Sequence, residues 1–189
     1  MALRQLPPRP VLLSLVTTVA LLLAPSVASA AWTVPPTPNV PGADDTNLYG
    51  VDCTSANSCM AVGTAVFPAG FREPRPSQTV AERWDGTSWQ LVPTPNPPGA
   101  FNSTLRDVSC PWENVCFAVG YWGTVPNSPP APPAIARPLI ELWNGTSWSI
   151  QSGPDVPNGG LLAVSCSGLL ACTAVGNAKR RTPRRTLGR

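Results

Sequence analysis

One cysteine-bearing motif occurs three times in this chain at nearly constant spacing. It reads Leu-x-x-Val-x-Cys, then five further residues, a second cysteine and, one residue later, Ala-Val-Gly. Its copies begin at Leu48, Leu105 and Leu161, which are 57 and 56 residues apart. A fixed period of this size is typical of repeat proteins, in which each copy buries its apolar face against the next. We therefore expect the chain to fold as stacked copies of one unit.

Each repeat is predicted to contain four short strands. The Leu-x-x-Val-x-Cys segment alternates apolar and other residues, which is the period of a half-buried strand, and a second strand ends at Ala-Val-Gly. Third and fourth strands flank Asp85-Gly86 in the first repeat and Asn144-Gly145 in the second. Residues 31–34 match a fourth strand too, so we expect about eleven strands in all. The fold class is all-β, an array of four-stranded antiparallel sheets in repeats that begin near residues 46, 103 and 159.

Four tryptophans flank the two predicted hairpin turns. The segment Glu-x-Trp-(Asp/Asn)-Gly-Thr-Ser-Trp occurs twice, 59 residues apart. Asp-Gly and Asn-Gly favour a type I′ turn, which needs positive φ at both central residues. Such a hairpin places both of its tryptophans on one face of the ribbon, where the rings stack or bury together. We interpret these residues as structural: Trp84, Trp89, Trp143 and Trp148.

The first thirty residues have the parts of a secretory signal. Arg4 and Arg9 precede an apolar run over residues 11–23, and small residues at 28–30 form a cleavage site. A membrane anchor is the alternative, but crossing the bilayer takes about 20 apolar residues and this run is shorter. We expect residues 1–30 to be removed and the rest to be secreted, extracellular or attached to the cell wall, with no transmembrane segment after cleavage.

The six cysteines are expected to form three disulfides. Export places them in an oxidising compartment, where an even number at regular spacing indicates a disulfide framework. Zinc binding would need shorter spacing or histidine ligands, and the chain has no histidine. The predicted pairs are Cys53 with Cys59, Cys110 with Cys116, and Cys166 with Cys172.

Charge is distributed unevenly along the chain. Residues 178–189 contain six basic residues, and we expect a disordered tail there; docking on anionic cell-wall polymers or lipid headgroups is the alternative. The repeat region, residues 31–177, contains five basic and ten acidic residues. This mildly acidic region does not favour nucleic acid as a partner, because phosphates select basic surfaces.

The repeat resembles a kelch blade. Ala-Val-Gly ends the second strand, Glu-x-Trp ends the third, and a tryptophan opens the fourth. The whole cysteine-bearing unit is similar to repeats of secreted, propeller-like proteins of actinobacteria. Two departures matter: kelch blades have Gly-Gly where this chain has Val-Gly, and Asp85-Gly86 does not make the Asp-x-Gly of a sialidase box. The resemblance covers residues 31–176 and implies a β-propeller architecture without sialidase chemistry.

The repeats are too few for a closed propeller. Propellers have four to eight blades, and four blades of about 57 residues need roughly 228 residues. The repeat region supplies about two and a half blades, which predicts a partial β-propeller. It is a fragment of a longer array, a piece that assembles with copies of itself, or an open array whose free sheet edges invite self-association.

The residue types favour a protein that is not an enzyme. Without histidine there is no Ser-His-Asp or Cys-His system, and paired cysteines are not available as nucleophiles. Glu82 and Glu141 occupy equivalent repeat positions, so we interpret them as strand residues and not as the paired carboxylates of a glycosidase. Asp44-Asp45 is a candidate for calcium, but adjacent acids are usually only solvated. We expect no catalytic residues, no metal and no cofactor.

Binding residues are expected in the long connections between the second and third strands. These connections, residues 67–78 and 121–137, carry aromatic and basic residues that do not recur from one repeat to the next. Long loops on a rigid scaffold concentrate binding residues, and aromatics beside arginines suit a glycan or a protein surface. Proline-rich spacers are the alternative. The candidate ligand-binding residues are Phe71, Arg72, Arg75, Tyr121, Trp122 and Arg137.

These observations predict a secreted, non-catalytic repeat module that binds a glycan or an extracellular protein. One alternative is a remnant of a kelch-like or glycosidase-like propeller enzyme, which predicts turnover or metal uptake. Another is a truncated product without an activity of its own. Ligand binding that depends on the loop residues separates the first hypothesis from the other two.

Overall fold

The structure is a computed structural model, and it describes residues 33–68, 75–124 and 136–178. These residues contain ten strands and no helix, which confirms the all-β prediction. The first repeat comprises β1 (Asp45–Ser55), β2 (Ser58–Val66), β3 (Ser77–Trp84) and β4 (Trp89–Val92). The second comprises β5 (Asn102–Trp112), β6 (Val115–Gly123), β7 (Ala136–Trp143) and β8 (Trp148–Ile150). The third comprises β9 (Gly159–Gly168) and β10 (Ala171–Ala178).

Consecutive strands pair in each complete repeat, so each forms a four-stranded antiparallel sheet. One parallel contact, with Ser77 opposite Asn102, joins the two sheets into an eight-stranded one. Strands β9 and β10 form a separate hairpin, which is the third repeat within the described residues. No described segment forms a helix that could cross a bilayer.

The predicted strand at residues 31–34 is wrong for its described half. Thr33 and Val34 belong to no strand, while Ala31 and Trp32 lie outside the described residues. A fourth strand must pair with a third strand. The third repeat lacks a fourth strand, but among the described residues it also lacks the third strand with which residues 31–34 could pair. The predicted export signal also lies outside the described residues, as does the predicted tail beyond Ala178.

The predicted disulfides join the first two strands of every repeat. In each pair the two Cα atoms are 4.0 Å apart. The bonds link Cys53 to Cys59, Cys110 to Cys116, and Cys166 to Cys172, which confirms all three pairs. Each bridge therefore closes a hairpin across its short turn.

The predicted tryptophan pairs are also present. Trp84 lies directly opposite Trp89, with ring centroids 5.6 Å apart, and Trp143 lies opposite Trp148, with centroids 5.8 Å apart. The rings are tilted by 48° and 45°. Offset, tilted contacts of this kind stabilise neighbouring aromatic rings.

The turns between these tryptophans are not type I′, contrary to prediction. Gly86 has a positive φ of 95°, but Asp85 does not have a positive φ. The Asp85 carboxylate instead accepts hydrogen bonds from the backbone N–H groups of Ser88 and Thr87, at 2.9 and 2.8 Å, and these bonds lower its pKa. The Asp85 side chain thus provides acceptors for the backbone N–H groups of the loop. The loop therefore needs only one residue with a positive φ, where a type I′ turn needs two. Gly145 is the equivalent glycine of the second repeat.

The core lies between the first and second repeats. We call the side of each repeat that carries the Leu, Val and first Cys of the motif its cysteine face. The cysteine face of the second repeat packs on the opposite face of the first. The core residues are Met60, Val62 and Ala81 of the first repeat, with Leu105, Val108, Cys116, Ala118, Leu139, Trp143 and Trp148 of the second.

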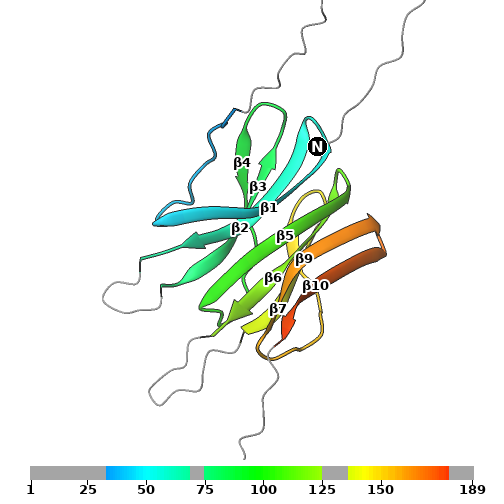
Figure 1. Cartoon of the computed structure of the whole chain (residues 1–189). Coiled ribbons are helices and arrows are strands. Elements are labelled where there is room, and N and C mark those ends of the chain that lie inside the picture. The colour runs from blue at the N-terminus through cyan, green and yellow to red at the C-terminus, as the bar shows by residue number, and fades with distance from the viewer. Residues whose placement is uncertain (1–32, 69–74, 125–135, 179–189) are drawn as a thin grey trace, which may run out of the picture. The chain divides into compact units, whose positions relative to one another are not determined.

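The first strands β1, β5 and β9 lie side by side (Figure 1), and equivalent hydrogen bonds link them. The Asp52 carboxylate accepts a bond from the N–H of Cys110 at 2.6 Å. At the next junction the Ser109 hydroxyl accepts one from the N–H of Cys166 at 3.1 Å. Asp52 and Ser109 both precede the first cysteine of their repeat. The two junctions therefore share this hydrogen bond, from the N–H of the first cysteine of one repeat to the residue that precedes the first cysteine of the repeat before it.

Strands β6 and β7 extend into the segment that was predicted to be a loop. Tyr121 and Trp122 lie in β6, and Trp122 pairs with Arg137 of β7. The pairing continues through Pro138 because β8 pairs with β7 only from Glu141 onward, so β7 is an edge strand at the proline. Three of the residues predicted to lie in loops, Tyr121, Trp122 and Arg137, are therefore strand residues.

Candidate functional site

An open cavity of about 390 Å³ lies between the second repeat and the β9–β10 hairpin, and we call it the hairpin cavity. The second repeat supplies one wall from strands β5, β6 and β7, and the hairpin supplies the other. The lining residues are Arg106, Tyr121, Ala136, Asn158, Gly159, Gly160, Leu162 and Asn177. Strands hold Arg106, Tyr121 and Asn177 in place, whereas Asn158 lies in the turn that precedes β9.

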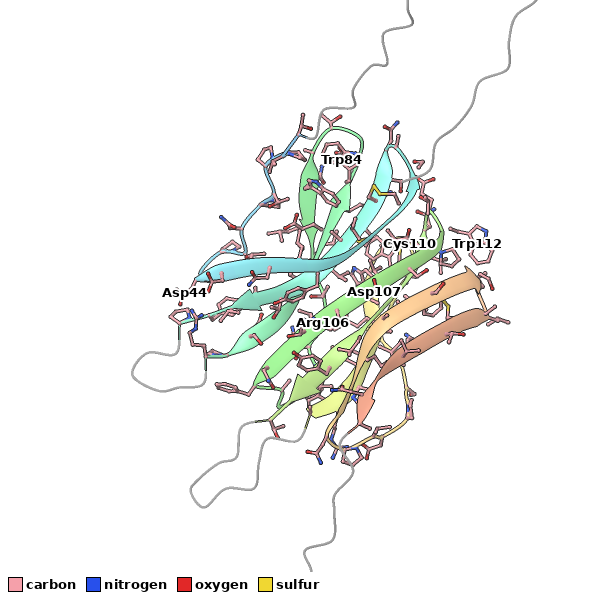
Figure 2. The ribbon with its side chains drawn as sticks, viewed as in Figure 1. Asp44, Trp84, Arg106, Asp107, Cys110 and Trp112 are labelled. Carbon is pink, nitrogen blue, oxygen red and sulfur yellow. A yellow bond between two sulfur atoms is a disulfide. The ribbon has the colours of Figure 1, made fainter. Side chains whose placement is uncertain are left out.

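Arg106 is the cation of the hairpin cavity. Its guanidinium carbon lies 4.4 Å from the centre of the Tyr49 ring, a cation–π contact that orients the side chain. Within the described residues no carboxylate lies within ion-pair distance of Arg106. The adjacent Asp107, also on β5 (Figure 2), accepts a hydrogen bond from the N–H of Val164 at 2.8 Å. The guanidinium therefore retains donors for an anionic ligand.

Glycine and asparagine shape the hairpin side of this cavity. A Cβ at Gly160 would lie only 3.0 Å from the Cβ of Tyr121, so the glycine lets the hairpin approach the tyrosine closely. Asn158 has a φ of 58°, in the left-handed region that asparagine tolerates better than most residues. Asn158 and Asn177 add amide groups, which can both donate and accept hydrogen bonds.

A second cavity of about 300 Å³ contains two of the predicted binding residues, Trp122 and Arg137. Nη1 of Arg137 lies 2.6 Å from Oδ1 of Asp155, so this arginine is already neutralised within the protein. Gln151 also lines the cavity, and its amide nitrogen donates to the Ser149 hydroxyl at 2.9 Å. Both polar groups thus have partners before any ligand arrives.

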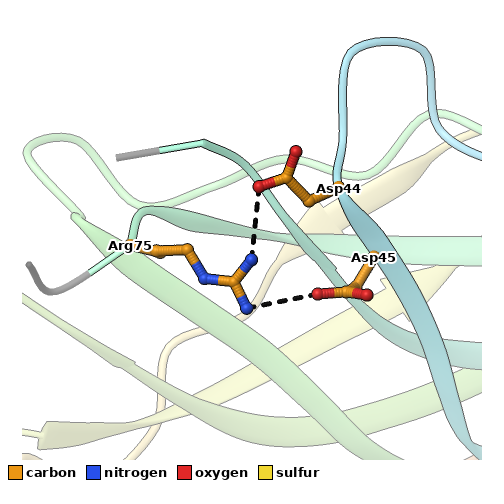
Figure 3. Close-up of polar contacts among 3 residues, drawn as sticks. All are labelled: Asp44, Asp45 and Arg75. Atoms are coloured by element: carbon orange, nitrogen blue, oxygen red, sulfur yellow. Dashed lines mark hydrogen bonds and ion pairs between the residues drawn. The ribbon is translucent and has the colours of Figure 1, made fainter. Parts of the chain in front are cut away.

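Arg75 lies in neither cavity. Figure 3 shows its guanidinium between two acids, with N–O distances of 3.2 Å to Asp45 and 3.2 Å to Asp44. Hydrogen bonds raise the pKa of Arg75, and the bond to Asp45 contributes more than the bond to Asp44. The acidic pair that sequence alone offered to calcium therefore binds an arginine. Two further predicted residues, Phe71 and Arg72, lie outside the described residues.

Glu82 and Glu141 are both buried, each with 0 % of its surface exposed. No hydrogen bond reaches either carboxylate in the described part of the chain. Burial raises the pKa of Glu82 to about 7 and that of Glu141 to about 8; the nearby Thr79 side chain lowers the latter slightly. A shifted carboxylate is a feature of active sites, but these two side chains are covered. No group of three or more metal-ligating side chains occurs among the residues described.

The structure divides the predicted binding residues and adds new ones. Tyr121 lies in the hairpin cavity, whereas Trp122 and Arg137 line the second cavity. Sequence reasoning missed Arg106 because it lies inside the repeated motif. The signal was nevertheless present: Arg106 occupies the position held by Tyr49 and Leu162 in the other repeats, so it does not recur.

The hairpin cavity combines an aromatic ring, a cation and two amides, a set that can bind a hydroxyl-rich, acidic small ligand.

The chain matches no protein-family model, no curated protein and no solved structure.

Proposed function

We propose that this chain is an exported, non-catalytic module that binds an acid-bearing carbohydrate in the hairpin cavity. The observation that carries the proposal is the Arg106 guanidinium, held against the Tyr49 ring without an acid partner among the described residues. A sugar carboxylate is a planar anion that arginine binds with two parallel hydrogen bonds. The Tyr121 ring offers an apolar surface for a sugar ring, and the two asparagines suit its hydroxyl groups.

Export is supported by the three disulfides, because such bonds persist in oxidising compartments. The predicted signal at residues 1–30 agrees with this location. We therefore propose that the protein works outside the cell.

We further propose that the repeats are arranged as part of a β-propeller of about two and a half blades. Support comes from two complete four-stranded antiparallel repeats and one hairpin, with their first strands adjacent. Equivalent hydrogen bonds at both junctions support the same rotation from each repeat to the next. In such an arrangement the hairpin cavity lies between two neighbouring blades.

Calorimetric titration with oligosaccharides of uronic acids, and with neutral oligosaccharides of the same length, tests the carbohydrate site. We expect binding of the acidic set and a loss of at least about tenfold in affinity for Arg106→Gln, since one charge-assisted contact is worth about 1.5–3 kcal/mol. Arg137→Gln is the matched control, because that arginine is paired with Asp155 in the other cavity. Unchanged binding by the Arg106 variant, or no binding of any acidic sugar, would overturn the proposal.

A further inference from the structure

The cysteine face of the first repeat has no repeat packed on it. Val51 is 60 % exposed there, whereas its equivalent Val108 in the second repeat is 4 % exposed. A groove of about 350 Å³ opens on this face, lined by Pro35, Thr37, Leu48, Tyr49, Gly50, Val51, Ala61 and Trp89. This lining is largely apolar, like the buried face of the second repeat.

The segment before β1 covers part of this face and borders the groove through Pro35 and Thr37. Val40 lines a cavity together with Val80 and Leu91, so it stands at the β3–β4 side of the sheet. The open groove lies over Val51 of β1 and Ala61 of β2. The uncovered area is centred on Val51 of β1, because Ala61 of β2 is only 3 % exposed.

The other end of the repeat array has a complementary free surface. The side of the β9–β10 hairpin that faces away from the second repeat carries Ala163, Ser165, Thr173 and Val175. Val175 is 59 % exposed, and every residue of β10 is exposed. Val62 and Val119 hold the position of Val175 in the two complete repeats, and both are buried.

The free hairpin contains no charged residue. Residues 156–178 include no Asp, Glu, Lys or Arg. Natural edge strands are usually protected from pairing by charges or proline. An exposed, uncharged strand of this kind is suited to be covered by another apolar surface.

The junctions inside the chain show which surface would fit. At the first junction the face that carries Val62 packs under the cysteine face of the second repeat. At both junctions the residue before the first cysteine accepts a hydrogen bond from the next repeat. Ser165 is the third residue of that series. The next donor in the series is the N–H of Cys53 at the other end of the array, which bonds to its own Asp52 side chain at 2.9 Å.

We propose that a second copy of this chain pairs head to tail with the first, its β1–β2 groove seated on the β9–β10 hairpin. Two copies that pair in this way cover both free faces if the ring closes and extend into a chain if it does not. The contact continues the junctions already present between the repeats. The carbohydrate site lies on the other side of the hairpin, and the two sites share one residue, since Tyr49, which orients Arg106, also lines the groove.

Sedimentation velocity of the full chain, expressed with its export signal so that the disulfides form, tests this pairing. We expect association that increases with concentration across the micromolar range. Val51→Arg and Val175→Glu should each weaken it at least about tenfold, since each buries an unpaired charge in the contact. Leu170→Arg is the control, because Leu170 is an exposed apolar residue in the hairpin turn and not on its face.

A mixture of the two variants separates head-to-tail pairing from other contacts. The Val51→Arg groove of one copy would meet the Val175→Glu hairpin of the other, so association should return on mixing. Both substituted residues are exposed, and near-UV circular dichroism with a thiol count checks that each variant is folded. A wild-type monomer at all concentrations would overturn the proposal, as would association that neither variant changes or a mixture that stays monomeric.

Discussion

The first and second repeats have the same sequence pattern and the same strand order, yet their cysteine faces have different environments. In the second repeat this face is buried under the first repeat, and in the first repeat it borders an open groove. The local pattern therefore determines the sheet, but the neighbouring repeat determines how deeply its residues are buried. Paired substitutions at equivalent positions can measure the contribution of that neighbour.

The two buried glutamates also differ with the environment of their repeats, and the property that differs is their pKa. Glu82 and Glu141 are equivalent residues, and the pKa is raised more for Glu141 than for Glu82. Glu141 faces the first repeat, where Thr79 lies close to it. Glu82 lies on the face that no repeat covers. The packed neighbour removes more water from the carboxylate and so disfavours its charged form more strongly.

The largest expected effect is on packing of the second tryptophan in each pair. Trp148→Ala should lower the free energy of unfolding by about 4 kcal/mol, because a buried aromatic leaves a large cavity. Trp89→Ala should lower it by about 2 kcal/mol, since Trp89 is only half-buried. Urea unfolding followed by circular dichroism measures both. Equal losses would mean that the first repeat does not shield the second.

The next largest effect is a pH dependence of stability. Both glutamates have pKa values above the ordinary 4.5, so the folded state binds protons that the unfolded state releases. The stability that these two protonated glutamates contribute is therefore fully present below about pH 4.5 and is lost as the pH rises through their folded-state pKa values. The fall between pH 5 and pH 8 should be on the order of 3 kcal/mol for Glu141 and smaller for Glu82, whose loss is complete only above pH 7.

Glutamine variants test this pH dependence at each site. Glu141→Gln should remove most of the fall in unfolding free energy between pH 5 and pH 8, and Glu82→Gln should remove a smaller part at lower pH. Each variant should also be more stable than the wild type at pH 8, since the amide cannot ionise. A wild-type stability that rises over this range would contradict the assignment.

The parts of the fold that follow from sequence are those set by local pattern. The repeat period, the strand order, the disulfides and the tryptophan pairs each depend on residues close together in the chain. Each of them was predicted correctly. The type I′ turn failed because the Asp85 side chain competes for the backbone N–H groups of the loop, a contact that the Asp-Gly signal does not include.

The candidate site could be predicted only in part. Tyr121 was identified because it does not recur from one repeat to the next. Arg106, which lines the same cavity, lies in another strand, and the hairpin that completes the cavity belongs to the third repeat. Likewise, Arg75 reaches Asp45 across 30 residues of sequence. Contacts of this kind arise from how the repeats stack, which the period of the motif does not specify.

The smallest expected effect compares the two junctions through the residue that precedes the first cysteine. The Asp52 carboxylate accepts hydrogen bonds from Cys53 and Cys110, whereas the neutral Ser109 hydroxyl accepts one from Cys166. A charged acceptor contributes more than a neutral one. Asp52→Ala should therefore lower the free energy of unfolding by about 2 kcal/mol, and Ser109→Ala by about 1 kcal/mol.

Hydrogen exchange can place each of these losses at its own junction. Because Ser109 holds only a two-stranded hairpin, its alanine variant should speed amide exchange mainly in β9 and β10 and leave the core between the first two repeats protected. Asp52→Ala should speed exchange throughout β1 and β5. Asp52→Ser, which gives the first junction the chemistry of the second, should recover about half of the loss. Equal global destabilisation by the Asp52 and Ser109 alanine variants would show instead that all three repeats unfold as one unit, and that the hairpin is as firmly held as the core.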